Sequence, residues 1–167
     1  MNYPPKHLRD HTHRKTCMLK GIDPLLTPEL LKILMEMGHD EALVLADANF
    51  SATRFAAGKP VIRLPGSSML QVVRAVTSLF PLAADVDHPV GFMGVSDQPT
   101  DYRSALQREV IEVINPDLLA HQSVEHIERY AFYERTRTAH AVVLTGELQP
   151  FGNFILRKGV LGEDLRP

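Results

Sequence analysis

The chain has 167 residues, of which 44% are hydrophobic and 23% charged, a composition typical of one globular domain. Its formal net charge is -2, from 18 basic and 20 acidic residues, which argues against a general nucleic-acid-binding protein. Cys17 is the one cysteine, so an intrachain disulfide is excluded and the reducing cytoplasm is the expected compartment. No stretch approaches the roughly 18 apolar residues of a membrane span, and no secretory signal is recognised.

Residues 1–17 differ from the rest of the chain. They carry four basic residues against Asp10 and almost no apolar side chains. Such a segment cannot contribute much to a hydrophobic core, so we predict a disordered basic leader. Residues 18–167 are then predicted to form a single folded domain.

The first predicted element is a helix that begins after Thr27. The threonine hydroxyl suits the N-cap, and Pro28 suits the first helical position. Apolar residues at helical spacing continue to Met37, and Gly38 is expected to end the helix. The apolar run over residues 42–46 predicts a strand that is buried on both faces.

Helices and strands continue to alternate along the chain. Further helices are predicted over residues 69–79, 100–114 and 132–139, the first of them capped by Ser67 or Ser68. Further strands are predicted over residues 61–64, 89–95, 127–131, 141–145 and 154–156. Alternation of this kind predicts a layered α/β fold.

His39 follows the first predicted helix and precedes the buried strand. A helix C-terminus favours a positively charged imidazolium, and the ordinary pKa of histidine, about 6.5, suits proton transfer near neutral pH. His39 is therefore a candidate acid or base. The alternative is a histidine that only caps the helix.

Asp47 comes directly after the strand over residues 42–46. Loops at the carboxyl ends of buried strands hold ligand sites in α/β folds, and a carboxylate accepts hydrogen bonds from hydroxyl groups. Asp47 is therefore a candidate ligand-binding residue. The alternative is an Asx turn that closes the strand.

Residues 128–135 are dense in charged and aromatic side chains. The guanidinium of Arg129 could present its fork of donors to ligand oxygens. Arginines and aromatics together also occur in nucleic-acid-binding proteins, but this stretch is short and the chain is acidic overall. A surface helix with ion pairs is the remaining alternative.

Residues 149–153 join two predicted strands and contain a turn signal. Gly152 allows the backbone to approach a ligand closely, and the amide of Asn153 offers both a donor and an acceptor. The segment is a candidate ligand-binding loop, with a plain turn as the alternative.

Asp85, Asp87 and His88 form an acidic cluster that could attract a hard cation, but their spacing matches no known cation-binding loop. The cluster is therefore better explained as a solvated turn before Pro89. The sequence contains no phosphate loop, no dinucleotide fingerprint, no zinc-hydrolase motif and no nucleophile elbow. Their absence argues against nucleotide-binding, zinc-hydrolase and serine-hydrolase functions.

Several stretches, in order, resemble the L-fucose mutarotase and D-ribose pyranase family. They are residues 18–22, 24–25, 28–32, 37–39, 47–48, 129, 131–135, 145–147, 152–153, 156 and 158–160. The resemblance extends over residues 18–160 and is closest at the two ends. The run Phe132-Tyr133-Glu134-Arg135 favours the L-fucose branch.

The resemblance implies a three-layer α/β/α fold with a mixed central sheet, and a homo-oligomeric ring of ten chains with sites near subunit contacts. It implies interconversion of anomers, or of pyranose and furanose forms, of a free monosaccharide by acid–base ring opening, without metal or cofactor. The family's proton donor falls on His39, and its substrate-binding residues on Asp47 and Arg129. Its substrate-contacting tripeptide falls on residues 151–153, here Phe151, Gly152 and Asn153.

Two residues depart from the family pattern. Phe151 stands where the family usually has tyrosine, so one hydroxyl donor is missing, and Asp40 follows His39 where glycine is frequent. The missing hydroxyl leaves two other classes open, a non-catalytic sugar-binding or sugar-transport accessory and a structural ring protein.

Overall fold

The computed structural model describes residues 19–162, so the predicted leader over residues 1–17 lies outside the described residues. The strands are β1 (Ala42–Ala46), β2 (Val61–Leu64), β3 (Val90–Met93), β4 (Val124–Ile127), β5 (Ala141–Thr145) and β6 (Phe154–Arg157). The helices are α1 (Pro28–Glu36), α2 (Ala52–Phe55), α3 (Met69–Thr77), α4 (Ala105–Ile114), the 3-10 helix η1 (Asn115–Asp117) and α5 (Arg129–Thr138).

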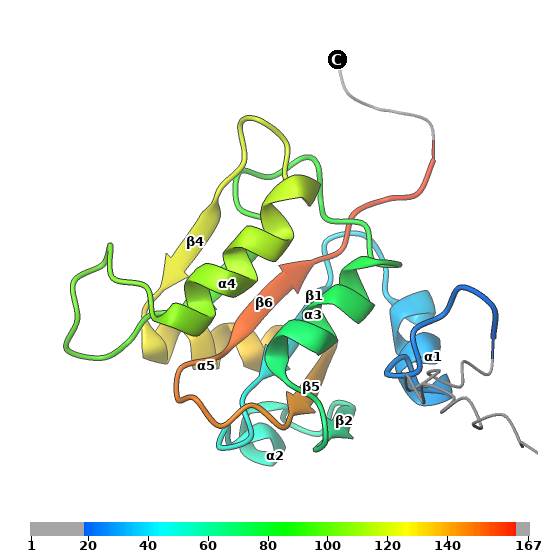
Figure 1. Cartoon of the computed structure of the whole chain (residues 1–167), viewed down its shortest axis with the longest axis horizontal. Coiled ribbons are helices and arrows are strands. Elements are labelled where there is room, and N and C mark those ends of the chain that lie inside the picture. Colours follow the sequence, from blue (N-terminus) through cyan, green and yellow to red (C-terminus); the bar gives the residue numbers. More distant parts are fainter. Residues whose placement is uncertain (1–18, 163–167) are drawn as a thin grey trace, which may run out of the picture.

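The six strands form one mixed sheet in the order β2-β5-β1-β6-β3-β4 (Figure 1). β6 runs antiparallel to β1 and β3, whereas the other neighbouring pairs are parallel. The carboxyl ends of β1, β3, β4 and β5 therefore share one edge of the sheet with the amino end of β6. We call this the carboxyl edge, and the opposite one the amino edge.

Helices cover both faces of the sheet, with α3 and α4 in front and α5 behind in Figure 1. Successive side chains of β1 point to opposite faces of the sheet and so divide the core in two. Leu43 and Leu45 belong to one part, and Val44 and Ala46 to the other. The first core contains residues of α1, α3 and α4, and the second contains residues of α2 and α5. The predicted three-layer α/β/α fold with a mixed central sheet is confirmed.

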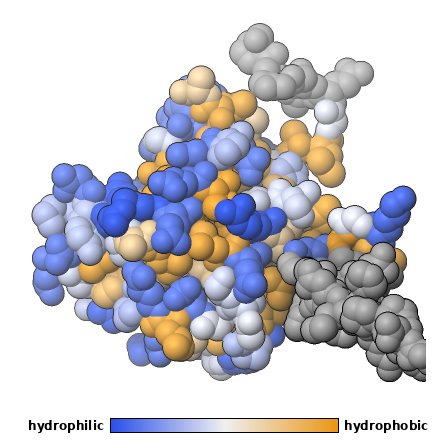
Figure 2. Space-filling view, viewed as in Figure 1, coloured by the Kyte–Doolittle hydropathy of each residue, from blue (hydrophilic) through white to orange (hydrophobic). Residues whose placement is uncertain are grey.

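The outer surface over α3 and α4 is mixed in character. Hydrophilic side chains lie on the outer sides of these helices, with smaller hydrophobic areas between them (Figure 2). Both helices begin with reciprocal capping boxes, Ser68 with Gln71 and Ser104 with Gln107. Each box satisfies two backbone N–H groups that the first turn leaves without helical partners.

The predicted strand over residues 127–131 is wrong. β4 ends at Ile127, and the carboxylate of Glu128 accepts hydrogen bonds from the backbone N–H groups of Tyr130 and Ala131, at 2.7 and 3.0 Å. Glu128 thereby caps α5, so the helix starts at Arg129 rather than at residue 132.

Other element bounds also differ from those predicted. α1 ends at Glu36, because Met37 is already extended, so Gly38 does not end the helix. α4 starts at Ala105 instead of residue 100, because Ser104 supplies the cap. The four-residue helix α2 was not predicted, since so short an element leaves little periodicity to detect.

Candidate functional site

The segments at the carboxyl edge bring together most of the residues singled out in the sequence. Asp47 follows β1, Arg129 follows β4, and Asn153 precedes β6. Residues that lie more than 80 positions apart in the chain meet here because β6 is inserted antiparallel between β1 and β3.

Asp47 and Asn153 form a reciprocal pair at this edge. The backbone N–H of Asp47 donates to Asn153 Oδ1 at 3.0 Å, and Asn153 Nδ2 donates to Asp47 Oδ2 at 2.8 Å. Asp47 Oδ1 also accepts a hydrogen bond from the N–H of Asn49 at 2.9 Å, which forms the predicted Asx turn. Both residues are only 3% exposed, so the pair is a rigid, nearly desolvated polar centre.

The turn before β6 packs tightly against α4. Phe151 adopts a left-handed conformation, with φ at 62°, which is uncommon for a residue other than glycine. A Cβ on Gly152 would lie 2.8 Å from Leu106 Cδ2 and 3.1 Å from the carbonyl oxygen of Gln149, so glycine suits this close approach.

Gln107 holds this turn in place, a role that the sequence reading missed. Its side-chain amide donates to the carbonyl oxygens of Met93 and Phe151, at 2.9 and 3.0 Å, and its side chain is fully buried. Gln107 thus joins the ends of β3, α4 and the turn before β6. The spacing Ser104-x-x-Gln107, which indicates a capping box, was the available signal in the sequence.

Arg129 is an exposed cation at the carboxyl edge. Its Nε donates to the hydroxyl of Tyr133 at 2.8 Å, and this bond is the main reason why the pKa of Arg129 is raised. Its guanidinium carbon lies 5.9 Å from the ring centre of Phe151. The two terminal nitrogens are then available for a ligand beside an aromatic wall.

A groove of about 360 Å³ opens beside Arg129. It is lined by Ser51, Arg54, Phe55, Arg129, Tyr130, Tyr133, Glu134 and Arg137. The rings of Phe55 and Tyr133 are stacked at 4.1 Å, and Arg54 and Arg137 both lie over Phe55. The groove therefore combines flat apolar surface with several donor groups. Tyr133 and Arg54 were not singled out individually in the sequence.

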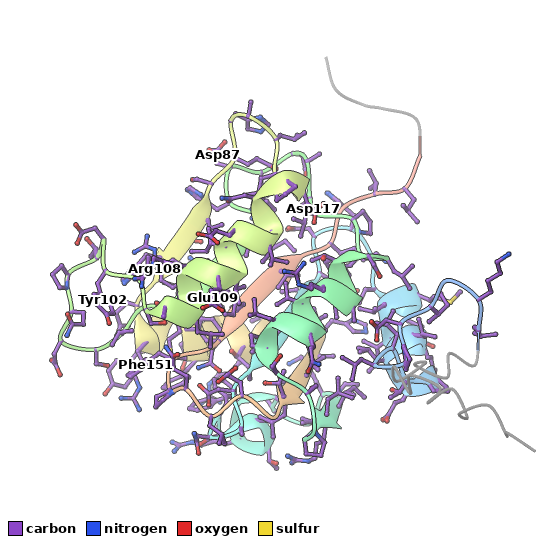
Figure 3. The ribbon with its side chains drawn as sticks, viewed as in Figure 1. Asp87, Tyr102, Arg108, Glu109, Asp117 and Phe151 are labelled. Atoms are coloured by element: carbon purple, nitrogen blue, oxygen red, sulfur yellow. The ribbon has the colours of Figure 1, made fainter. Side chains whose placement is uncertain are left out.

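His39 lies at the amino edge, away from the other predicted site residues. At about 3.3 Å per residue, β1 alone separates His39 from Asp47 by about 16 Å. His39 Nε2 lies 3.1 Å from Asp85 Oδ1, and both side chains are exposed. Figure 3 shows Asp87, from the same loop as Asp85, near the top of the view and Phe151 well below it, near the lower end of α4. One chain therefore does not bring His39 together with Asp47, Arg129 and Asn153.

A hollow of about 700 Å³ lies at this amino edge. Its lining residues are His39, Asp40, Glu41, Ala42, Asp87, His88, Glu125, Arg135, Thr138, Ile155 and Arg157. Most of its charges are paired, Arg135 with Glu125, Arg157 with Asp40, and His140 beside it with Glu41. The hollow is therefore strongly polar, and its lining has four acidic side chains against two arginines, with histidine counted as neutral.

Two carboxyl groups are shifted in opposite directions. Burial raises the pKa of Asp47, although hydrogen bonds from Asn49 and Asn153 oppose the change. The bond from Arg135, with contacts of 2.6 and 2.7 Å, lowers the pKa of Glu125. We expect a ¹³C NMR titration of the carboxyl carbons to give Asp47 a pKa above, and Glu125 a pKa below, the ordinary carboxyl value of about 4. Asp47→Asn and Glu125→Gln would identify the two signals.

The two shifts have opposite consequences for stability. Since the folded-state pKa of Asp47 is raised, its contribution is largest below the unfolded pKa and is lost as the pH rises through the folded value. Glu125 contributes above its unfolded pKa, and its contribution is lost as the pH falls through the lowered folded value. Unshifted midpoints for both carboxyls would contradict this description of the site.

Metal ligation has little support in the described part of the chain. Between residues 19 and 162, no three or more His, Cys, Asp or Glu side chains are grouped so as to hold a metal ion. In particular, Asp85, Asp87 and His88 do not form such a group. Over the same residues, none of the helices has the length and apolar character to cross a membrane.

These features define a small single-domain α/β protein that gathers polar, potential ligand-binding side chains at the carboxyl edge of a mixed sheet. The model of the RbsD / FucU transport protein family matches residues 20–161. The chain belongs to this family, as the sequence motifs predicted.

Three relatives illustrate the similarity. An L-fucose mutarotase from Actinobacillus pleuropneumoniae serotype 5b is 41% identical over 145 residues, which cover 86% of this chain and 97% of the relative. The structure of the Streptococcus pneumoniae fucose mutarotase in complex with L-fucose has a TM-score of 0.78 and 35% identity, covering 86% of this chain and all of the other. Bacillus subtilis RbsD complexed with D-ribose has a TM-score of 0.62 and 26% identity, covering 82% and 95%.

Proposed function

We propose that this protein is a mutarotase that interconverts the anomers of L-fucose or a related free monosaccharide by acid–base ring opening. The observation that carries the proposal is the likeness, over nearly the whole length, to an L-fucose mutarotase and to a fucose mutarotase with L-fucose bound. The chain matches the L-fucose mutarotases at higher identity than the ribose-bound relative, which favours L-fucose as substrate.

The chemistry requires two proton movements. The anomeric hydroxyl loses a proton and the ring oxygen gains one, the ring opens, and closure on the other face of the aldehyde gives the other anomer. Neither movement is a redox step. We assign the donation to the ring oxygen to His39, because an imidazole exchanges protons readily near neutral pH.

The carboxyl edge would bind the sugar. Arg129 would donate to hydroxyl oxygens through its terminal nitrogens, and the ring of Phe151 would pack against apolar C–H groups. Asp47 and Asn153 would complete the recognition at the exposed margin of their pair, while Gly152 lets the backbone come close. Water or Asp47 would accept the proton of the anomeric hydroxyl.

A second copy of the chain would supply His39. Within one chain His39 and Arg129 lie at opposite edges of the sheet, so a complete site needs the amino edge of one copy beside the carboxyl edge of another. Acidic side chains outnumber basic ones in the lining of the hollow beside His39, whereas three arginines and one glutamate line the groove, so the charges favour such a contact. A head-to-tail contact gives a ring when its rotation closes, in line with the decamer that the family resemblance implies. We place the protein in the cytoplasm, where its single Cys17 stays reduced.

Saturation-transfer NMR on equilibrated sugar tests the proposal. We expect the protein to accelerate exchange between the α and β signals of L-fucose more than those of D-ribose, D-galactose or L-rhamnose. Calorimetry on the same sugars separates the remaining classes. Binding of L-fucose without faster exchange would indicate a sugar-binding or sugar-transport accessory, which the missing hydroxyl at Phe151 keeps open. Neither binding nor exchange would favour a structural ring protein.

A further inference from the structure

The loop between α3 and β3 brings a carboxylate to His39 from 46 residues further along the chain. Asp85 Oδ1 lies 3.1 Å from His39 Nε2, and this contact is the main reason why the pKa of Asp85 is lowered. The sequence reading considered Asp85 only as a member of a cation-binding cluster.

The loop is held firmly before Asp85. The N–H of Gly159 donates to the carbonyl oxygen of Pro81 at 2.8 Å, and the N–H of Ala83 donates to that of Arg157 at 3.0 Å. A Cβ on Gly159 would lie 2.3 Å from the carbonyl oxygen of Leu82, so the two backbone segments are in direct contact here. These contacts fix the start of the loop to the end of β6.

Gln122 holds the loop on both sides of Asp85. Its side-chain amide donates to the carbonyl oxygens of Ala83 and Val86, each at 2.8 Å. The N–H of Ser123 donates to the carbonyl oxygen of Asp87 at 3.0 Å. The Asp85 backbone is therefore anchored from two directions, which is more than an exposed turn requires.

Three other charged groups near His39 already have partners. Asp40 pairs with Arg157, Glu41 pairs with His140, and Lys158 Nζ donates to the carbonyl oxygen of Leu34. Asp85 is the carboxylate that contacts the imidazole. The arrangement resembles that of an acid–base histidine oriented by a carboxylate on its far nitrogen.

We infer that Asp85 is a positioning residue for His39: its carboxylate accepts the Nε2–H bond and leaves Nδ1 as the nitrogen that exchanges a proton with the sugar. This inference rests on the proposed function. The doubly protonated imidazole gives its Nδ1 proton to the ring oxygen and stays protonated on Nε2. Ring closure returns a proton from the newly formed hydroxyl to Nδ1, so the histidine is restored.

Three variants of the full-length protein test the inference. Asp85→Asn removes the charge, Asp85→Glu retains it, and Asp87→Asn makes the same charge change in the same loop without contacting His39. The readouts are the ¹⁵N shifts of the His39 ring, which report which nitrogen carries the proton in the neutral form, and the exchange rate of L-fucose anomers. Both sites are exposed, so folding should be retained.

We expect Asp85→Asn to change the predominantly Nε2–H ring into a mixture of tautomers and to slow exchange about tenfold. Asp85→Glu should restore much of the Nε2–H tautomer and of the exchange rate. Asp87→Asn should change neither the ring shifts nor the rate. Unchanged ring shifts and rate in Asp85→Asn, with exchange lost in His39→Ala, would overturn the role of Asp85 alone. Wild-type exchange in His39→Ala would overturn this inference together with the assignment of His39.

Discussion

Replacing His39 with alanine should reduce the enzyme-catalysed exchange of L-fucose anomers by about 10²–10⁴-fold, the usual contribution of one positioned acid–base group. Since the side chain is exposed and makes one hydrogen bond within residues 19–162, the fold should be unaffected. Saturation-transfer NMR measures the rate, and circular dichroism checks the fold. A variant that exchanges the anomers as fast as wild type would remove His39 from the mechanism.

A mixing experiment extends this prediction to the origin of each residue. His39→Ala and Arg129→Ala chains, each inactive alone, are co-assembled in equal amounts. If every site takes His39 from one copy and Arg129 from another, random assembly leaves about one quarter of the sites intact. About a quarter of wild-type activity should then return. A site built within one chain would give no recovery, and light scattering would show whether the mixed chains had assembled.

Replacing Gln107 with leucine should damage stability and the site together. Leucine is similar in size but leaves the carbonyl oxygens of Met93 and Phe151 and the N–H of Ser104 without their side-chain partner. Because buried unpaired polar groups cost about 1–3 kcal/mol each, we expect a loss of about 3 kcal/mol in the free energy of unfolding. Exchange should also fall, because the turn that carries Phe151 and Asn153 loses its anchor.

Gln71→Leu is the matched control for this variant. Gln71 occupies the same position of the capping box in α3, but it is exposed and makes no comparable bonds to strand ends. It should cost about 1 kcal/mol or less and leave exchange unchanged. Urea unfolding and anomer exchange measure both effects. Equal losses in the two variants would show that Gln107 acts only as a cap.

Local signals accounted for much of the fold. Thr27 and Pro28 marked the start of α1, and the apolar run of β1 identified a strand buried on both faces. The same reasoning failed at β4, where a half-buried edge strand of sequence VEHI shows little apolar alternation. The following aromatics resemble a strand, but the Glu128 carboxylate caps a helix there instead.

The site was only partly predictable, because strand order is not encoded locally. The motifs predict Asp47, Arg129 and Asn153 as site residues, but nothing near them reveals that β6 lies between β1 and β3. Likewise, the step from His39 to Asp47 suggests proximity until one counts the strand that separates them. The contacts of Asp85 and Gln122 join distant loops, so no sequence spacing could indicate them.

The proposed division of the site between two copies of the chain has a consequence for how the protein is assayed. In a dissociated chain, His39 at the amino edge would have no sugar beside it, and the sugar-binding residues at the carboxyl edge would have no proton donor. Neither edge could then catalyse the reaction alone. Turnover per chain would therefore decline on dilution below the dissociation constant of the assembly. Sugar that bridges two copies would shift the balance back toward the oligomer.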